Sequence, residues 1–508
     1  MLKTLKTLKP AQLITLAILI VIFVLFTSQK ISLPTADLGR HLKNGEIFFK
    51  EHKVYEENHY SYTYPHFEFL NHHWGSGVIF YAVQQLTGFT GLSIFVMLFN
   101  IATLLTFFYI AAKYGNFELA VLATVIVIPV ISSRSEIRPE TFSYFLCGIF
   151  FLLLWEYKFT SNLKLLYVLP ILELIWVNLH VYFFMGIAIA GVFALSALLT
   201  KKYDQFIKLS ILIIICSAVS LINPAGLKGA LYPSTIFNNY GYRILENQSV
   251  IFMDKFFHNF WSGNAFKYAF AALVLSWIAA FKFKTKHLEL FILSIALSAI
   301  AWKAIRNFSL FAYFAIPIIT INLYGLKKYK DIYPYLFTLC GFSLFVVMII
   351  NGTAWSGRLA EFGFGLRKGV PDAAEFFKRN HLAGPIFNNY DIGGYLIYYL
   401  FPQEKVFIDN RPEAYPLDFF NHILIPMQED QSKFKLVDKQ YNFNTVFFYR
   451  GDITVWAQNF MISLIKDPDW APVYADDYNI IFVKRNAKNA EIIKKLEMPK
   501  SMFSITSN

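Results

Sequence analysis

The sequence predicts a polytopic α-helical membrane protein with an α/β domain at its C-terminal end. Three observations predict this fold class: an apolar composition, a long series of apolar runs, and a change of pattern after residue 350. Of the 508 residues, 56% are hydrophobic and 16% are charged, and the mean hydropathy is +0.44. Soluble domains contain about 25% charged residues, so this chain is composed for a lipid solvent.

The apolar runs have lengths of roughly 16 to 25 residues, which suit helices that cross a bilayer. About eleven such spans are expected. They lie near residues 11–28, 89–112, 117–133, 141–157, 163–179, 183–200, 207–222, 266–282, 287–303, 308–325 and 333–350. The first run follows three lysines and has no convincing cleavage site, so we interpret it as a retained anchor.

The placement of lysine predicts the topology. With the N-terminus inside, every connection expected on the cytoplasmic side carries lysine, as the positive-inside rule requires. These lysines are Lys113, Lys158, Lys164, Lys201, Lys202, Lys208, Lys282, Lys284, Lys286, Lys327, Lys328 and Lys330. The net charge of +12 therefore reflects topology and not a nucleic-acid partner. An odd number of spans places the C-terminal region outside.

The pattern changes after residue 350, where short β-rich runs alternate with amphipathic helical segments. The expected strands are 385–388, 405–409, 445–449 and 479–483. This alternation predicts a small α/β domain with a largely parallel sheet. We therefore divide the chain into a transmembrane domain, 1–350, and an extracytoplasmic α/β domain, 351–508. The three cysteines all lie in apolar runs and form neither a disulfide framework nor a CxxC metal site.

The first outer loop, at about residues 29–88, holds the leading candidates for chemistry. Asp37, Arg40 and His41 come shortly after the first span, and His73 and Trp74 precede the next apolar run. Two segments of this loop, 42–49 and 78–86, have the pattern of helices that lie on a membrane surface. A carboxylate at that depth is either a functional group or a simple helix-end charge, and the polar cluster around Asp37 favours function.

Two further outer connections carry arginine. Arg134, Glu136 and Arg138 lie between the third and fourth spans, and Lys303 and Arg306 lie between the ninth and tenth. Arginine binds phosphate oxygens in a bidentate manner, so these residues are candidates for a lipid-phosphate site. A salt-bridged loop and interface anchors remain the alternatives.

Asn178 and His180, at the outer end of the fifth span, would be unfavourable against lipid, so we expect them to face a cavity or to pair with neighbours. In the tail domain, the segments 388–394 and 408–413 each follow a strand, where α/β folds place ligand sites. Turns and domain docking are the more common roles of such segments.

Together these segments resemble the GT-C superfamily of polytopic glycosyltransferases, which includes the protein O-mannosyltransferases, the aminoarabinose transferases of lipid A and uncharacterised bacterial members. The resemblance rests on Ala36-Asp-Leu-Gly-Arg-His41, Asn71-His-His-Trp74, Arg138-Pro139 and Trp176-Val-Asn-Leu-His180. It extends to Tyr390-Asp-Ile-Gly-Gly-Tyr-Leu396 and Val406-Phe-Ile-Asp-Asn-Arg-Pro-Glu413, and so covers nearly the whole length.

The resemblance implies an inverting transfer of a sugar from a polyprenyl-phosphate donor to an acceptor hydroxyl on the outer face of the cytoplasmic membrane. Asp37 would act as general base or as a metal or acceptor ligand, with His41 and Glu136 as further catalytic candidates. Some relatives use a divalent metal and some do not, so a Mg²⁺ or Mn²⁺ ion on Asp37 and Glu136 stays open. Leu38, where several relatives have a second carboxylate, argues against a two-acid metal site.

Two other function classes remain as alternatives: a transporter or flippase for a lipid-linked or anionic substrate, and a membrane assembly scaffold. Transporters carry charges near the bilayer centre, whereas here most charges lie at the ends of the expected spans, with Glu173 inside a run. The composition favours a multi-pass protein of the bacterial inner membrane. The acceptor, whether protein, lipid or glycan, is not specified by the sequence.

Overall fold

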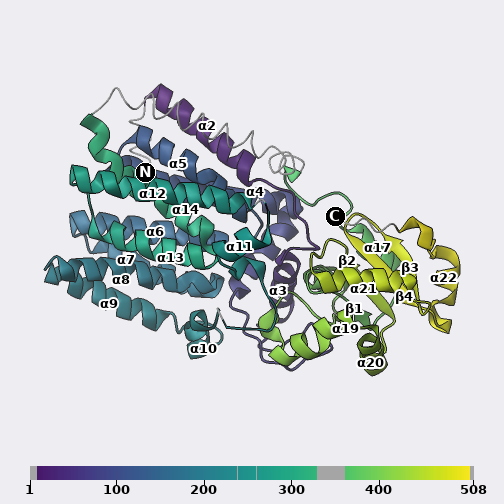
Figure 1. Ribbon diagram of the computed structural model, residues 1–508. Helices are drawn as coiled ribbons and strands as arrows, with labels where there is room; N and C mark the ends of the chain where they lie inside the picture. The colour runs from purple at the N-terminus through teal and green to yellow at the C-terminus, as the bar shows by residue number, and fades with distance from the viewer. Residues whose placement is uncertain (1–8, 237, 259, 329–360, 504–508) are drawn as a thin grey trace. The chain divides into compact units, whose positions relative to one another are not determined.

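A computed structural model describes residues 9–236, 238–258, 260–328 and 361–503 (Figure 1). The chain divides into two compact units. A helical unit comprises Met1–Lys30, Thr90–Ile236 and Ile244–Phe364, and a mixed unit comprises Ile31–Phe89, Phe237–Arg243 and Gly365–Asn508. The mixed unit thus combines most of the first loop with the C-terminal region, and each unit is described separately below.

The long helices of the helical unit coincide with ten of the expected spans. They are α2 (Pro10–Thr27), the later part of α4 (Trp74–Tyr114), α5 (Phe117–Ile131), α6 (Glu140–Thr160), α7 (Lys164–Leu179), α8 (Phe184–Leu199), α9 (Tyr203–Val219), α12 (Trp261–Phe283), α13 (Leu288–Lys303) and α14 (Phe308–Asn322). In the described part of the chain, seven helical stretches are long and apolar enough to cross a membrane. The chain is therefore a multi-pass membrane protein. The expected span at 333–350 lies outside the described residues, so the count of eleven stays a prediction.

Helix α14 lies at the centre of the helical unit. Every residue of α14 is buried, and the helix packs against α5, α6, α12 and α13. A helix that is apolar on all sides belongs in the interior. The peripheral helix α9, in contrast, exposes Ile207, Ile211 and Ile214, and an apolar exposed face fits contact with lipid chains.

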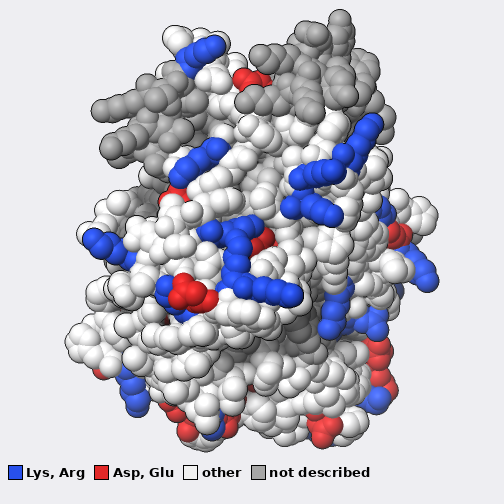
Figure 2. Space-filling model, turned by 90° about the vertical axis from the view of Figure 1, so that its left-hand side faces the viewer, with Lys and Arg blue, Asp and Glu red and all other residues white. Residues whose placement is uncertain are grey.

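One end of the helical unit is rich in basic side chains, as Figure 2 shows. The turns after α6, α8 and α12 lie at this end of the bundle in Figure 1. These turns carry lysines, which include Lys202 and Lys284. Positive charge at one end of a helical bundle is the expected signature of a cytoplasmic face. The orientation of the chain in the membrane stays a prediction.

The sheet of the mixed unit has four strands in the described residues, β1 (Ile386–Phe387), β2 (Thr445–Tyr449), β3 (Trp470–Ala475) and β4 (Asn479–Lys484), in the order β1-β2-β4-β3. The pairing of β1 with β2 is parallel, but β4 pairs with β2 and with β3 in antiparallel fashion. The prediction of a largely parallel sheet was wrong. The crossover through α21 (Val455–Lys466) gives β3 the direction of β2, and a tight turn then returns β4 between them.

Two strand assignments also differ from expectation. The run at 405–409 is not part of the sheet, and Val406 instead forms an isolated bridge with Ser61 of the first loop. Strand β3 was missed because Pro472 interrupts its apolar pattern. The other helices of this unit are α17 (Asp372–Arg379), α18 (Gly393–Leu400), α19 (Ile425–Glu429), α20 (Gln431–Tyr441) and α22 (Ala490–Leu496).

Both amphipathic segments expected in the first loop are helical. The first lies within α3 (Leu38–Glu51), and the second forms the start of α4, which is interrupted at Gly88. Gly88 has φ of 67° and ψ of −174°, a conformation that a residue with a Cβ rarely adopts. This glycine therefore separates the segment at 78–86 from the apolar run that follows.

Helix α3 packs closely on the start of α18. A Cβ added to Gly39 would collide with the carbonyl oxygen of Gly394 and would lie 3.2 Å from the Cβ of Tyr398. Gly394 is similarly restricted, because its added Cβ would lie 3.2 Å from the carbonyl oxygen of Ala36. The two glycines let the first loop approach the C-terminal segment at backbone contact.

We expect Gly39→Ala to destabilise the protein by about 2 kcal/mol, because the Gly394 backbone has little freedom to move away from the added methyl group. Thermal unfolding of the purified protein in detergent would measure the change in Tm. Gly191→Ala in α8 is the matched control, since a Cβ there meets no atom within 4 Å and alanine is the better helix former. An equal loss of Tm in both variants would contradict this packing argument.

Candidate active site

Asp37 stands at the N-terminal end of α3, but its side chain makes no capping hydrogen bond to that helix. Asn410 Nδ2 instead donates a hydrogen bond of 2.5 Å to Asp37 Oδ1, and Arg40 Nη2 lies 3.8 Å from the same oxygen. The Asp37 side chain keeps 25% of its surface exposed. The carboxylate is thus oriented by partners and still accessible, which a simple helix-end charge does not require.

The amide of Asn410 is held in place by its two neighbours in the chain. Asp409 and Arg411 form a buried ion pair with Nη2 to Oδ2 of 2.6 Å and Nε to Oδ1 of 2.7 Å. Tyr415 donates to Asp409 at 3.1 Å, and Arg411 Nη2 donates to Asn58 of the first loop at 2.7 Å. Paired charges with all these hydrogen bonds make a rigid buried turn, and Asn410 lies within it.

More carboxylates surround Asp37 in the mixed unit. Burial, followed by the charges of Asp452 and Asp37, raises the pKa of Asp391 to about 7. Burial also raises the pKa of Glu413, against the opposing effect of Arg40. Like charges disfavour simultaneous ionisation, so Asp391 titrates near neutral pH in this cluster. The two tail segments, 388–394 and 408–413, therefore converge on the candidate carboxylate of the first loop.

The aromatic candidates of the first loop lie beside α3. The ring of His41 is buried and packs edge-on against His73 with centroids 5.3 Å apart. The rings of His72 and His73 are 3.7 Å apart, and Trp74 contacts Phe48 at 5.2 Å. His41, one helical turn after Asp37, and His73 are thus brought together, with Trp74 packed against the same helix.

The arginine candidates gather around Glu246 in the helical unit. Arg138 Nη1 donates to Glu246 Oε2 at 3.0 Å, Arg134 Nη1 donates to the same oxygen, and Arg306 Nη2 lies 4.0 Å from Glu246 Oε1. Arg134 also donates to Glu140 at 2.8 Å. Although burial opposes this, the three arginines hold the pKa of Glu246 well below its usual range.

Other members of this arginine cluster have defined partners. Arg306 donates to Asn247 at 3.0 Å, and its guanidinium lies 5.8 Å from the ring centre of Tyr182. The buried Nε of Arg306 has no hydrogen-bond partner among the described residues. Glu136 accepts a 2.7 Å hydrogen bond from Arg138 Nε and keeps 41% of its side chain exposed.

The remaining candidates have structural partners. His180 is fully buried, and its Nδ1 lies 2.7 Å from Ser143 Oγ, which also accepts from Trp176 Nε1. Asn178 donates to the carbonyl oxygens of Leu174 and Ile222. Both residues pair with neighbours, as one of the sequence interpretations expected. Lys303 is exposed in the last turn of α13.

A metal site would need converging ligands. Across the described residues, no three His, Cys, Asp or Glu side chains come together to hold a metal ion. Asp37 belongs to the mixed unit and Glu136 to the helical unit, and Arg40 and Arg138 respectively lie beside them. A divalent cation on this pair stays a prediction from the sequence.

Three residues that the structure places in these clusters were missed as site residues: Asn410, Asp391 and Glu246. Asn410 and Asp391 lie in tail segments that each follow an expected strand, and this placement was the available signal, although the run before Asn410 is not a strand in the structure. Glu246 lies in a short 3₁₀ turn, Leu245–Asn247, and its role depends on arginines 112 and 108 residues away in sequence. Nothing local in the sequence indicates such a partner.

No protein-family model and no curated protein matches the chain, whereas solved structures do. The oligosaccharyltransferase AglB from Archaeoglobus fulgidus, in complex with an inhibitory peptide and a dolichol-phosphate, matches with a TM-score of 0.58 at 13% identity, over 92% of this chain and 74% of AglB. ArnT from Cupriavidus metallidurans in the apo state matches with a TM-score of 0.54 at 13% identity, over 96% of this chain and 98% of ArnT.

ArnT bound to undecaprenyl phosphate matches with a TM-score of 0.52 at 11% identity, over 96% of this chain and 99% of ArnT. The chain has the GT-C fold. The resemblance drawn from the sequence is confirmed at the level of fold. The candidate catalytic carboxylate, Asp37, belongs to the mixed unit, and the candidate phosphate-binding arginines belong to the helical unit.

We expect the stability of the protein to fall as the pH rises toward 7, in part through Asp391. Its pKa is 3.8 ordinarily and about 7 in the folded chain, so its stabilising contribution is complete below pH 3.8 and is lost as the pH passes the folded value. Asn does not ionise. The Tm of Asp391→Asn relative to wild type should therefore rise with pH, by the equivalent of roughly 2 kcal/mol after allowance for partial exposure.

Thermal unfolding between about pH 4.5 and about pH 8.5 would measure this difference. Asp477→Asn is the control, because the side chain of Asp477 is exposed and lies in the same unit. The Tm difference between this control and wild type should stay flat with pH. A flat difference for Asp391→Asn as well would show that Asp391 ionises normally in the folded protein.

Proposed function

We propose that this chain is a glycosyltransferase that moves a sugar from a polyprenyl-phosphate carrier to an acceptor hydroxyl. One observation carries the proposal: Asp37 is oriented by Asn410 and Arg40 while its carboxylate stays accessible. The fold supports the donor class, since the related structures include ArnT with undecaprenyl phosphate and AglB with a dolichol-phosphate. The lysine-rich end of the helical unit supports transfer on the outer face of a bacterial inner membrane.

In the proposed reaction, Asp37 accepts the proton of the acceptor hydroxyl as the oxygen attacks the anomeric carbon. The bond between that carbon and the phosphate oxygen breaks, and the lipid phosphate leaves with the electron pair. Attack from the face opposite the phosphate inverts the anomeric configuration. Arg40 keeps a positive charge 3.8 Å from Asp37, which favours the ionised carboxylate in the presence of Asp391 and Asp452. His41, in the next turn of α3, positions this end of the helix through its contact with His73.

The proposal assigns the donor phosphate to Arg134, Arg138 and Arg306. Their guanidinium groups already surround one anionic group, the carboxylate of Glu246, and guanidinium binds phosphate in the same geometry as carboxylate. Arg306 retains a buried Nε without a partner among the described residues. Lys303, at the adjacent helix end, adds positive charge at longer range.

We expect Asp37→Asn to lower the rate of sugar transfer by about 10²- to 10⁴-fold, because asparagine cannot accept the proton. Release of free lipid phosphate from a panel of polyprenyl-phosphate sugars would be measured with purified protein in nanodiscs. Donor binding by the variant should be unchanged. Asp418→Asn, on the same unit but highly exposed, should retain wild-type activity.

The outcomes of this experiment separate the function classes. Equal release by wild type and Asp37→Asn would remove Asp37 from the chemistry and direct attention to Glu136. A flippase would be favoured if the protein bound the donor and moved labelled donor across the bilayer, but released no free lipid phosphate with any class of acceptor. Absence of donor binding in the wild-type protein would favour an assembly scaffold.

We expect Arg306→Gln to weaken the binding of undecaprenyl phosphate by about ten-fold, because it removes a charged bidentate donor from the cluster. Lys303→Gln, which removes an exposed charge from the adjacent helix end, should change binding by less than about three-fold. Arg306→Lys keeps the positive charge and controls for a folding defect caused by loss of that charge. Its affinity for undecaprenyl phosphate should lie between those of wild type and Arg306→Gln. Equal affinities for all four proteins would place the phosphate elsewhere.

A further inference from the structure

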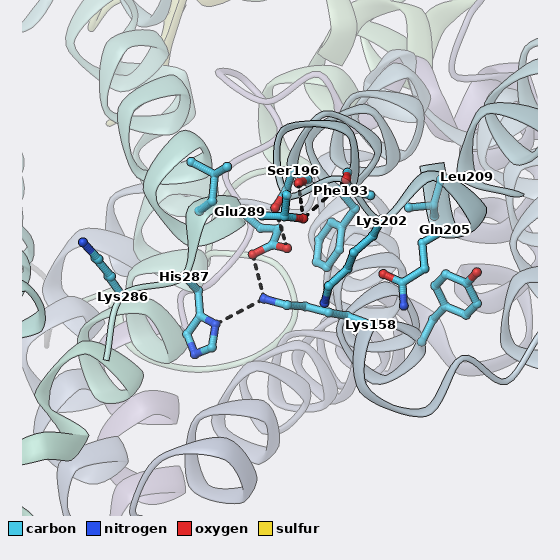
Figure 3. Close-up of a pocket in the computed structure, with 13 residues that line it drawn as sticks. Lys158, Phe193, Ser196, Lys202, Gln205, Leu209, Lys286, His287 and Glu289 are labelled. Carbon is cyan, nitrogen blue, oxygen red and sulfur yellow. Dashed lines mark hydrogen bonds and ion pairs between the residues drawn. The ribbon is translucent and has the colours of Figure 1, made fainter. Parts of the chain in front are cut away.

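A polar cavity lies at the basic end of the helical unit. It has a volume of about 280 Å³ and is lined by the last turns of α6 and α8 and the first turns of α9 and α13. Figure 3 shows Lys158, Lys202 and Glu289 directed into it. No residue of this cavity takes part in the proposed sugar transfer. The cavity lies at the end of α6 and the start of α13, whereas the arginine cluster lies before the start of α6 and after the end of α13.

The charges in this cavity do not balance. Lys158 Nζ donates to Glu289 Oε2 at 2.8 Å and to His287 Nδ1 at 3.1 Å. Because an ammonium group can only donate, the ring nitrogen of His287 accepts this hydrogen bond. Lys202 is close enough to Lys158 to repel it and has no ion-pair partner among the described residues. Two ammonium groups therefore face one carboxylate.

The helix ends reinforce the positive potential. Both α9 and α13 begin at the cavity with Lys202 and His287 as their N-terminal flanking residues, and the N-terminal end of a helix attracts anions. The opposing end of α8 is partly neutralised by Thr200, whose hydroxyl donates to the carbonyl oxygen of Ser196 at 2.7 Å. Lys286 contributes less, because its ammonium lies over the Phe281 ring at 5.5 Å.

The lining of the cavity also includes apolar side chains. Phe193, Ala197 and Leu209 line it together with the lysines. A ligand that fits this lining has a negatively charged group and an adjoining apolar portion. The location at the ends of membrane helices places this charge at the level of lipid headgroups.

We propose that this cavity binds a phosphate group, supplied by the headgroup of an anionic membrane phospholipid, through Lys158 and Lys202. The phosphate oxygens accept hydrogen bonds from the two ammonium groups, and the glycerol and the start of the acyl chains contact Phe193 and Leu209. Glu289 sets the strength of the site, since it competes with the phosphate for Lys158. The bound lipid contacts the turns after α6 and α8 and the start of α13, and so stabilises their arrangement.

The test measures retention of phosphatidylglycerol and of phosphatidylcholine on the full-length protein in detergent by native mass spectrometry. We expect wild type to prefer phosphatidylglycerol, and Lys202→Gln to weaken its binding by about five-fold, the effect of one lysine near an anionic surface. Lys208→Gln is the matched control, because Lys208 is on the same helix but pairs with Asp204 at 2.6 Å. Binding to Lys208→Gln should equal that of wild type.

Glu289→Gln should change the affinity for phosphatidylglycerol in the direction opposite to Lys202→Gln. This variant therefore separates a role in binding from a role in structure. Removal of the competing carboxylate should strengthen phosphatidylglycerol binding several-fold, whereas a variant that merely loosened the helices would weaken it. Inorganic phosphate titrated in lipid-free detergent is the second arm: binding that depends equally on Lys202 would assign the site to free phosphate and overturn the lipid source. Unchanged lipid binding in both Lys202→Gln and Glu289→Gln would overturn the site itself.

Discussion

The buried ion pair of Asp409 and Arg411 is the interaction on which the candidate active site depends. Removal of one partner from such a pair leaves an uncompensated buried charge and costs about 3–5 kcal/mol. Here the pair also fixes the backbone at Asn410, the residue that orients Asp37. Arg411 also donates a hydrogen bond to Asn58, so its guanidinium connects the tail segment to the first loop.

This arrangement explains why the first loop and the C-terminal segment form one unit. Asp37 and Asn410 are 373 residues apart in sequence, and their hydrogen bond requires backbone contact between α3 and α18. Gly39 and Gly394 permit that approach, and the bridge between Ser61 and Val406 continues it. The surroundings of Asp37 are therefore built from the first loop and the C-terminal segment together.

The sequence predicted the features that have a local signal and failed on those that do not. Apolar runs located the long helices to within a few residues because each span must satisfy its own backbone hydrogen bonds in lipid. The direction of β4 and the strand character of Trp470–Ala475 were missed, because strand pairing depends on a crossover and on Pro472. Asp37 was proposed as a candidate from its loop, whereas Asn410 and Glu246 could be recognised only through partners that are distant in the sequence.

The two charged clusters differ in a way that follows from their proposed tasks. Arg134, Arg138 and Arg306 are matched by Glu136, Glu140 and Glu246, so the charges of this cluster balance. A phosphate bound by these arginines, as proposed, would compete with the resident carboxylates for the guanidinium groups. The cluster around Asp37 instead concentrates carboxylates and retains a proton on Asp391 near neutral pH. A site that must accept a proton benefits from nearby groups that titrate in the working range, whereas a site that must release an anionic product benefits from a resident carboxylate ready to take its place.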